Sequence, residues 1–140
     1  MKWYLHGLRQ SGDFAGRARR KEFWMFLMFN IIITFLISII GSIIGYMGVL
    51  VFLYNVAVLI PFLSLTVRRL HDTGRSGWCW LLSICPYIAA IVSVLFGLAG
   101  WSLPIIVISL IGVIVFFFFM AENGISEQNQ YGDNPKLSDA

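Results

Sequence analysis

Two long stretches of the sequence contain no Asp, Glu, Lys, Arg or His, and they restrict the chain to a membrane fold. The first covers residues 23–67, which is 45 residues, and the second covers residues 78–121, which is 44 residues. A helix needs roughly 20 apolar residues to cross a hydrocarbon core about 30 Å thick, so each stretch is long enough for two crossings. Only 12% of the chain is charged, against about 25% in an average soluble domain. The sequence therefore predicts an integral membrane protein.

Glycine-containing breaks divide each stretch into two helices. Residues 45–48 interrupt the first stretch and residues 97–101 interrupt the second. Because both breaks are short, each stretch predicts a helical hairpin, in which every helix satisfies its own backbone polar groups. The expected fold is all-α, with four transmembrane helices arranged as two hairpins. The expected spans lie near residues 23–45, 49–67, 78–97 and 102–121.

The basic residues predict the orientation of these spans. Six of the ten Lys and Arg residues lie in segment 1–22, three in loop 68–77 and one in tail 122–140, and the hairpin tips contain none. Positively charged flanking segments remain in the cytoplasm. We therefore expect both termini and loop 68–77 on the cytoplasmic side. The first two segments carry net charges of +4 and +2 and the tail carries −3. Docking of this acidic tail on the basic segments stays an open alternative to a solvated tail.

Small and polar residues recur at steps of three and four in the first and third spans. Such residues mark helix contacts in lipid, so both stripes are expected to face each other, a second subunit or another membrane protein. A polar stripe also suits a pore or substrate path, but ion and proton pathways usually contain charged residues, and these spans have none. Asn55 in the second span is expected to donate an interhelical hydrogen bond. The packing residues are Asn30, Thr34, Ser38, Gly41 and Gly45 in the first span, and Ser83, Pro86, Ala90, Ser93 and Gly97 in the third.

The sequence RRLHDTGRSGW at residues 68–78 and the basic segment near residue 17 predict a site for anionic lipid headgroups or a partner protein. Planar guanidinium groups suit phosphate, and each cation beside an anionic membrane surface gains about 1 kcal/mol. Two other roles stay open for these residues: an orientation signal, and ion pairs such as one between Asp72 and a nearby arginine. The candidate residues are Arg17, Arg19, Arg20, Arg68, Arg69, His71, Asp72 and Arg75.

Catalysis is not the expected role of this site. His71 and Asp72 are adjacent in sequence, so their side chains point in different directions and do not by themselves form a proton relay. Cys79 and Cys85 have no metal-ligand spacing, and we expect no catalytic residue, metal, cofactor or nucleic acid partner. The alternative is a small membrane enzyme or transporter that handles a phosphorylated, lipid-soluble substrate through His71, Asp72 and the loop arginines.

Four separate motifs resemble one known family. They are Phe14-x-Gly16-Arg17-x-Arg19-Arg20-x-Glu22-Phe23-Trp24, then Pro61, then Arg68 to Trp78, and finally Asn129-x-Tyr131-Gly132-x-Asn134-Pro135. Together they resemble the family called domain of unknown function 805, over nearly the whole chain. Asp133 departs from the proline that is usual there. The resemblance implies a multi-pass protein of the bacterial inner membrane and assigns no reaction. It also implies that the three polar motifs form one unit.

Overall fold

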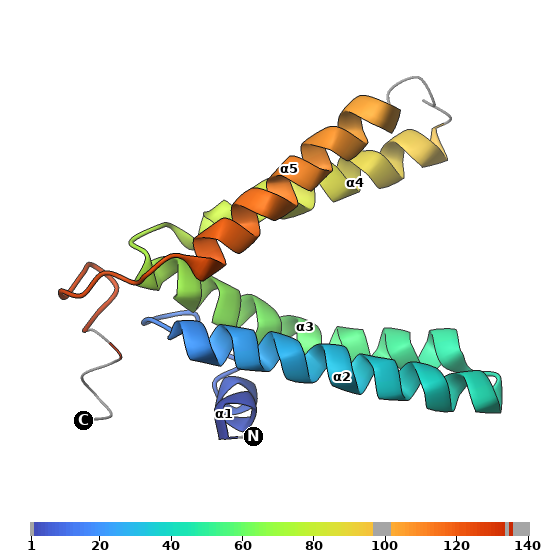
Figure 1. Ribbon diagram of the computed structural model, residues 1–140, viewed down its shortest axis with the longest axis horizontal. Helices are drawn as coiled ribbons and strands as arrows, with labels where there is room; N and C mark the ends of the chain where they lie inside the picture. Colours follow the sequence, from blue (N-terminus) through green and yellow to red (C-terminus); the bar gives the residue numbers. More distant parts are fainter. Residues whose placement is uncertain (1, 97–101, 134, 136–140) are drawn as a thin grey trace.

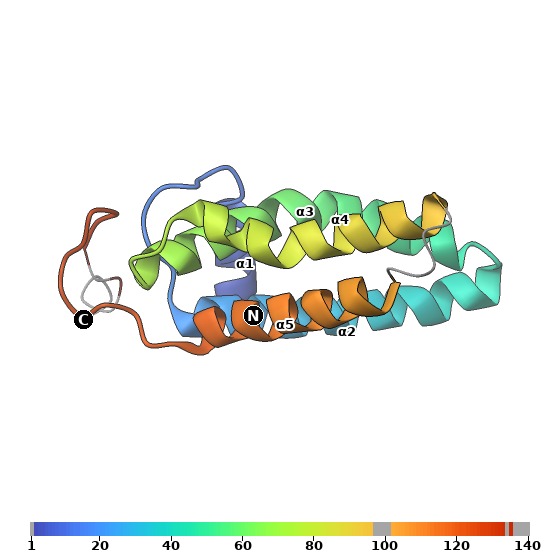
Figure 2. The ribbon, with the colours of Figure 1, turned by 90° about the horizontal axis from the view of Figure 1, so that it is seen from above.

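The computed structural model describes residues 2–96, 102–133 and 135, and all of the regular structure in this part of the chain is helical. Helices α2 (Arg20–Ile44) and α3 (Met47–Asp72) form one hairpin, and α4 (Leu81–Leu95) and α5 (Ser102–Ala121) run side by side as a second pair. The two pairs meet at one end and diverge from it (Figure 1). The short helix α1 (Lys2–Arg9) lies across the first hairpin (Figures 1 and 2).

Three helices are long and apolar enough to cross a membrane: Arg20–Ile44, Met47–Asp72 and Leu103–Ala121. The expected third span is shorter in the part of the chain that is described. It begins as a 3₁₀ turn, η1 (Gly77–Trp80), and continues as α4 with 15 residues, below the roughly 20 that a full crossing needs. The all-helical membrane fold is therefore confirmed, with three candidate spans.

The glycines at the tip of the first hairpin have two different roles. Gly41 is buried, and a Cβ atom added there would lie 2.6 Å from Cα of Met47, so the turn requires glycine for close approach. Gly45 has a φ of 81° and ends α2, a conformation that glycine adopts without steric cost. Gly45, expected in the packing stripe, thus acts in the structure as a helix terminator.

Helix α3 continues through Asp72, five residues beyond the expected end of its span at Val67. The expected loop 68–77 is therefore helical over its first half, and the chain turns at Gly74, where φ is 75°. Hydropathy shows where a segment leaves the hydrocarbon but not where its hydrogen bonding stops. Basic groups near a helix C-terminus interact favourably with the helix dipole, and the last turn of α3 contains Arg69 and His71.

The buried apolar core lies where the two hairpins meet. It consists of Ala18, Phe23, Phe26, Leu65, Leu70 and Met120. Most apolar side chains farther along the helices are exposed, and Ile43, for example, is 81% exposed. Such a surface is expected of helices that face lipid rather than water. Segments 10–22, 68–77 and 120–133 each contribute one residue to this core, Ala18, Leu70 and Met120 respectively, and we refer to these three segments together as the polar rim.

Tyr54 provides the hydrogen bond between α2 and α3. Its hydroxyl donates to Oδ1 of Asn30 over 2.7 Å, and the hydroxyl of Tyr4 on α1 lies 3.4 Å from it. Asn55 was expected to bridge the helices, but its Nδ2 donates to the carbonyl of Val51 on its own helix. That expectation is wrong because Asn55 lies on an exposed side of α3.

Of the remaining packing residues, Thr34 and Ser38 are half-buried on α2. The third-span residues are only partly described. Ser83, Pro86, Ala90 and Ser93 lie on α4, but their side chains are outside the described part of the structure, and Gly97 lies outside the described residues altogether.

Candidate functional site

Asp72, the last residue of α3, is the centre of the polar rim. The residue is 5% exposed, and its carboxylate contacts two guanidinium groups. Arg17 approaches Oδ1 with Nε at 2.9 Å and a terminal nitrogen at 2.9 Å, and Arg69 donates to Oδ2. The expected ion pair between Asp72 and a nearby arginine is thus present, and it involves two arginines.

The same two arginines hold the chain that follows α5. Arg69 donates from Nε to the carbonyl of Met120 over 3.2 Å and from a terminal nitrogen to the carbonyl of Glu122. Arg17 donates to the carbonyls of Ile125 and Glu127, the latter over 2.8 Å. Each guanidinium group therefore joins the carboxylate on α3 to backbone oxygens after α5. These contacts dock the middle of the acidic tail on the other two segments of the rim.

Burial lowers the pKa of the Arg69 guanidinium group from its usual value, and the charge of Asp72 offsets only part of this effect. Burying a charge costs free energy unless the charge is paired and its donors form hydrogen bonds. Arg69 is paired with Asp72, and each of its three guanidinium nitrogens donates a hydrogen bond. We therefore assign Arg17, Arg69 and Asp72 to an internal charge cluster.

Gly124 is the point at which the tail passes Asp72. The nitrogen of Ile125 donates to the carbonyl of Asp72 over 2.9 Å. A Cβ atom added at Gly124 would lie 1.9 Å from Oδ2 of Asp72, far inside contact distance. The carboxylate therefore fills the space that any larger residue at position 124 would need.

His71 is directed away from Asp72. Its ring stacks on Tyr131 with a centroid separation of 3.8 Å, and Nδ1 lies 3.2 Å from the carbonyl oxygen of Gly16. Asn129 donates from Nδ2 to the backbone carbonyl of His71 over 2.9 Å. His71 lies beyond the apolar part of α3, and burial lowers its pKa from the usual 6.5. The ring therefore contacts both the tail and the segment before α2.

The other two loop arginines point to different places. Arg68 is 3% exposed and donates to Oε1 of Gln10, while its Nε and second terminal nitrogen have no hydrogen-bond partner among the described residues. Arg75 pairs with Glu122 over 2.5 Å and lies 4.1 Å above the ring of Phe119. Neither joins the cluster around Asp72.

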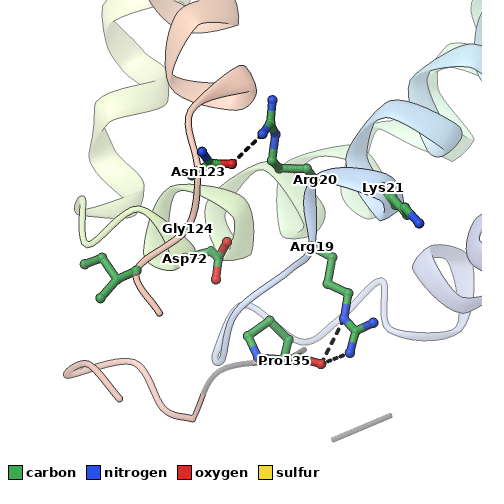
Figure 3. Close-up of a pocket in the computed structure, with 8 residues that line it drawn as sticks. Arg19, Arg20, Lys21, Asp72, Asn123, Gly124 and Pro135 are labelled. Carbon is green, nitrogen blue, oxygen red and sulfur yellow. Dashed lines mark hydrogen bonds between the residues drawn. The ribbon is translucent and has the colours of Figure 1, made fainter. Parts of the chain in front are cut away.

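A pocket of about 440 Å³ opens between the start of α2 and the chain after α5 (Figure 3). Arg20 crosses it to donate to Oδ1 of Asn123 over 2.5 Å, and Arg19 donates from Nε to the carbonyl of Pro135 over 2.8 Å. Lys21 is exposed at its edge. The lining residues are Arg19, Arg20, Lys21, Asp72, Asn123, Gly124, Ile125 and Pro135. We call this the basic pocket.

The structure thus divides the eight residues that the sequence singled out. Arg19, Arg20 and Asp72 line the basic pocket, whereas Arg17, Arg68, Arg69, His71 and Arg75 do not. Lys21, which the sequence places in the basic segment before α2, also lines the pocket. The sequence reasoning missed Asn123, Gly124 and Tyr131 as contacts. A signal existed for Tyr131, which belongs to the tail motif. Within the described residues, no group of three His, Cys, Asp or Glu side chains could hold a metal ion.

These features define a class: an all-helical membrane protein whose helix pairs are joined at one end by a buried arginine–carboxylate cluster. The chain belongs to the family described as "Protein of unknown function (DUF805)", which matches residues 11–133. It is 35% identical to inner membrane protein YhaH of Escherichia coli (strain K12) over 142 residues and 39% identical to YhaI of the same strain over 138 residues, with 98% of each chain covered. The uncharacterized protein YiiR of that strain is 31% identical over 123 residues, with 86% of this chain and 84% of YiiR covered. No solved structure matches.

Proposed function

We propose that this chain is a four-span protein of the bacterial inner membrane, with both termini in the cytoplasm, whose basic pocket binds the phosphate-containing headgroup of an anionic lipid. The observation that carries the proposal is the pocket of about 440 Å³ lined by Arg19, Arg20 and Lys21. The role is binding, without a chemical reaction.

The charge of the pocket supports an anionic ligand. Asp72 is the one carboxylate among its lining residues, and Arg17 and Arg69 already neutralise it. The three lining cations therefore dominate the local potential. Arginine presents planar donors that match phosphate oxygens, and lysine adds a mobile point charge.

The depth of the pocket supports a lipid rather than a dissolved anion. Arg20 and Lys21 begin α2, and the uncharged stretch starts two residues later at Phe23. Their side chains therefore lie at the level where the hydrocarbon core gives way to headgroups. Cations at this level gain about 1 kcal/mol each from an anionic leaflet.

The arrangement of the helices supports four spans with cytoplasmic termini. Helix α4 runs beside α5, which is long enough to cross a membrane (Figure 2). The basic segments before α2 and at the end of α3 come together at one end of the molecule, and a concentration of positive charge on one side favours the cytoplasm. The relatives YhaH and YhaI are inner membrane proteins by name.

The geometry favours binding over the enzymatic alternative. A general base needs a side chain free to take a proton within reach of the substrate. The carboxylate of Asp72 is held by two arginines, and the ring of His71 is covered by Tyr131. Both residues are used in holding the tail.

Native mass spectrometry with dioleoylphosphatidylglycerol as the probe tests the proposal. The purified full chain is titrated with this lipid, as wild type and as the Arg20→Gln/Lys21→Gln variant. We expect the variant to lose about 10- to 30-fold in affinity, because two headgroup contacts of about 1 kcal/mol each are removed.

The matched control is Lys2→Gln/Arg9→Gln, which removes the same charge at the two ends of α1. This variant should bind the probe as wild type does. Equal binding by all three proteins, or equal losses in both variants, would contradict a specific site in the basic pocket.

A further inference from the structure

A second cavity, of about 600 Å³, lies along the first hairpin within the apolar part of the chain. Helix α2 contributes Thr34 and Ser38 to its lining and α3 contributes Asn55, among mainly apolar neighbours. Thr34 is 11 residues beyond Phe23 and Asn55 is 12 residues before Val67, so each lies about 17 Å inside the uncharged stretch. That depth is near the middle of a hydrocarbon core about 30 Å thick.

Two polar groups in this cavity have unused hydrogen-bonding capacity. Asn55 donates from Nδ2 to the carbonyl of Val51, and among the described residues its side-chain oxygen has no partner. The hydroxyl of Thr34 likewise makes no hydrogen bond to any described residue, whereas that of Ser38 donates to the carbonyl of Thr34. Hydrocarbon offers no water to such groups, so each unpaired group carries a free-energy cost.

A second pocket lies beside this cavity, on the side of the second hairpin. Leu59 and Phe62 line the cavity, and both also line this apolar pocket of about 250 Å³, which α4 and α5 help to form. The larger cavity is within the size range of small-molecule sites, which are mostly apolar with a few polar groups that fix orientation. A ligand with one polar group and an apolar chain would match these two spaces: its polar group would lie in the larger cavity and its chain in the apolar pocket.

We propose that this cavity binds a neutral lipid whose polar group is a hydroxyl beside an ester carbonyl, the chemistry of diacylglycerol. The lipid hydroxyl donates to the side-chain oxygen of Asn55, and its carbonyl accepts from the hydroxyl of Thr34. One acyl chain extends past Leu59 and Phe62 toward the second hairpin.

The lining of the cavity selects against charged lipids and against a second copy of the chain. Its described lining residues include no Asp, Glu, Lys, Arg or His, so among them a phosphate at this depth would have no counter-charge. An amide pair between Asn55 of two copies would satisfy both amides but leave the hydroxyl of Thr34 unpaired. The proposed ligand satisfies both groups.

Photolabelling with a diacylglycerol that carries a diazirine in one acyl chain tests this site. The full chain is reconstituted in phosphatidylcholine vesicles, labelled, and mapped by peptide mass spectrometry. We expect labelling concentrated at Leu59, Phe62 and their neighbours. The Thr34→Val/Asn55→Leu variant keeps the side-chain shapes and removes both hydrogen bonds, so labelling there should fall about five-fold.

Two controls make the result specific. Ser109→Ala removes a hydroxyl from α5 that bonds its own helix, and it should label as wild type does. A phosphatidylcholine probe with the same diazirine should label the cavity weakly in every variant. Labelling spread evenly over all exposed helix faces, or unchanged in the double variant, overturns the proposal. A detergent-stable dimer that dissociates in the double variant would also overturn it, and would assign the cavity to a second copy.

Discussion

In the polar rim, the charged side chains of Arg17, Arg69 and Asp72 are buried and paired, whereas along the helices beyond it large apolar side chains are exposed. Asp72 is 5% exposed and held by two arginines, while Ile43 near the tip of the first hairpin is 81% exposed. Lipid tails are as apolar as the side chains they contact, so the helices gain little from the hydrophobic effect when they associate. The comparison teaches that specific polar contacts in the rim, together with the small apolar core beside them, determine how the two hairpins join.

The largest effect should come from Asp72→Asn, which removes the carboxylate at the centre of the rim. Arg17 and Arg69 would remain buried without a counter-charge, and breaking a buried ion pair on one side costs about 3–5 kcal/mol. Thermal unfolding in detergent would measure the loss. Glu122→Gln is the control, because it removes the exposed partner of Arg75 and should cost under about 1 kcal/mol. Equal losses would contradict the central role of Asp72.

A smaller loss is expected from Gly124→Ala, which places a methyl group where the Asp72 carboxylate lies. Overpacking of this kind typically costs about 1–3 kcal/mol. Residues 122–133 should then detach from the other two segments of the rim. Faster cleavage of these residues in limited proteolysis would show the detachment. Gly12→Ala, where a Cβ atom would meet nothing within 4 Å, should leave the proteolysis rate unchanged. Similar rates in both variants would disprove the tight approach at Gly124.

Acidification should loosen the tail through His71, with a smaller effect than either substitution. Because burial lowers the pKa of His71 in the folded protein, the folded state takes up fewer protons than the unfolded state. The stabilisation is fully present above pH 6.5 and is lost as the pH falls through the lowered pKa. Unfolding temperatures measured at pH 7.5 and 5.5 should therefore differ more for wild type than for His71→Phe. An equal difference in both proteins would show that His71 is not the responsive group.

The smallest effect should be that of Tyr54→Phe, within the apolar part of the first hairpin. It removes the hydrogen bond to Asn30, and such bonds between membrane helices contribute about 0.6 kcal/mol. Tyr46→Phe in the exposed hairpin turn is the matched control and should have no measurable effect. A loss for Tyr54→Phe as large as that for Asp72→Asn would reverse the comparison between the rim and the helices.

The fold follows from the sequence to a large extent, because lipid imposes one strong requirement on every crossing segment. The two uncharged stretches and the glycine breaks are sufficient to predict an all-helical membrane protein. The extension of α3 to Asp72 could not be read in this way. The extension depends on contacts between the last turn of α3 and segments far away in the sequence. A local hydropathy pattern contains no information about such contacts.

The sequence was sufficient to predict an ion pair at Asp72, but not to identify the arginines that form it. A buried carboxylate needs a cation, so an arginine partner for Asp72 could be expected. That Arg17, 55 residues away, is this partner follows only from the meeting of the segments in space. Arg68 and Arg69 are adjacent in sequence but point to different sides of α3, toward Gln10 and Asp72. Asn123 and Gly124 carry no charge and gave no signal.

The contacts of Arg17 and Arg69 with the chain after α5 also determine when, during translation, the rim can be completed. Both arginines leave the ribosome before Met120, Glu122 and Ile125, the residues whose carbonyl groups they bind in the finished protein. The carboxylate of Asp72 is available to both arginines once α3 has been translated, whereas their carbonyl acceptors after α5 are translated only later. Completion of the rim is therefore a late event, because it requires the chain that follows α5.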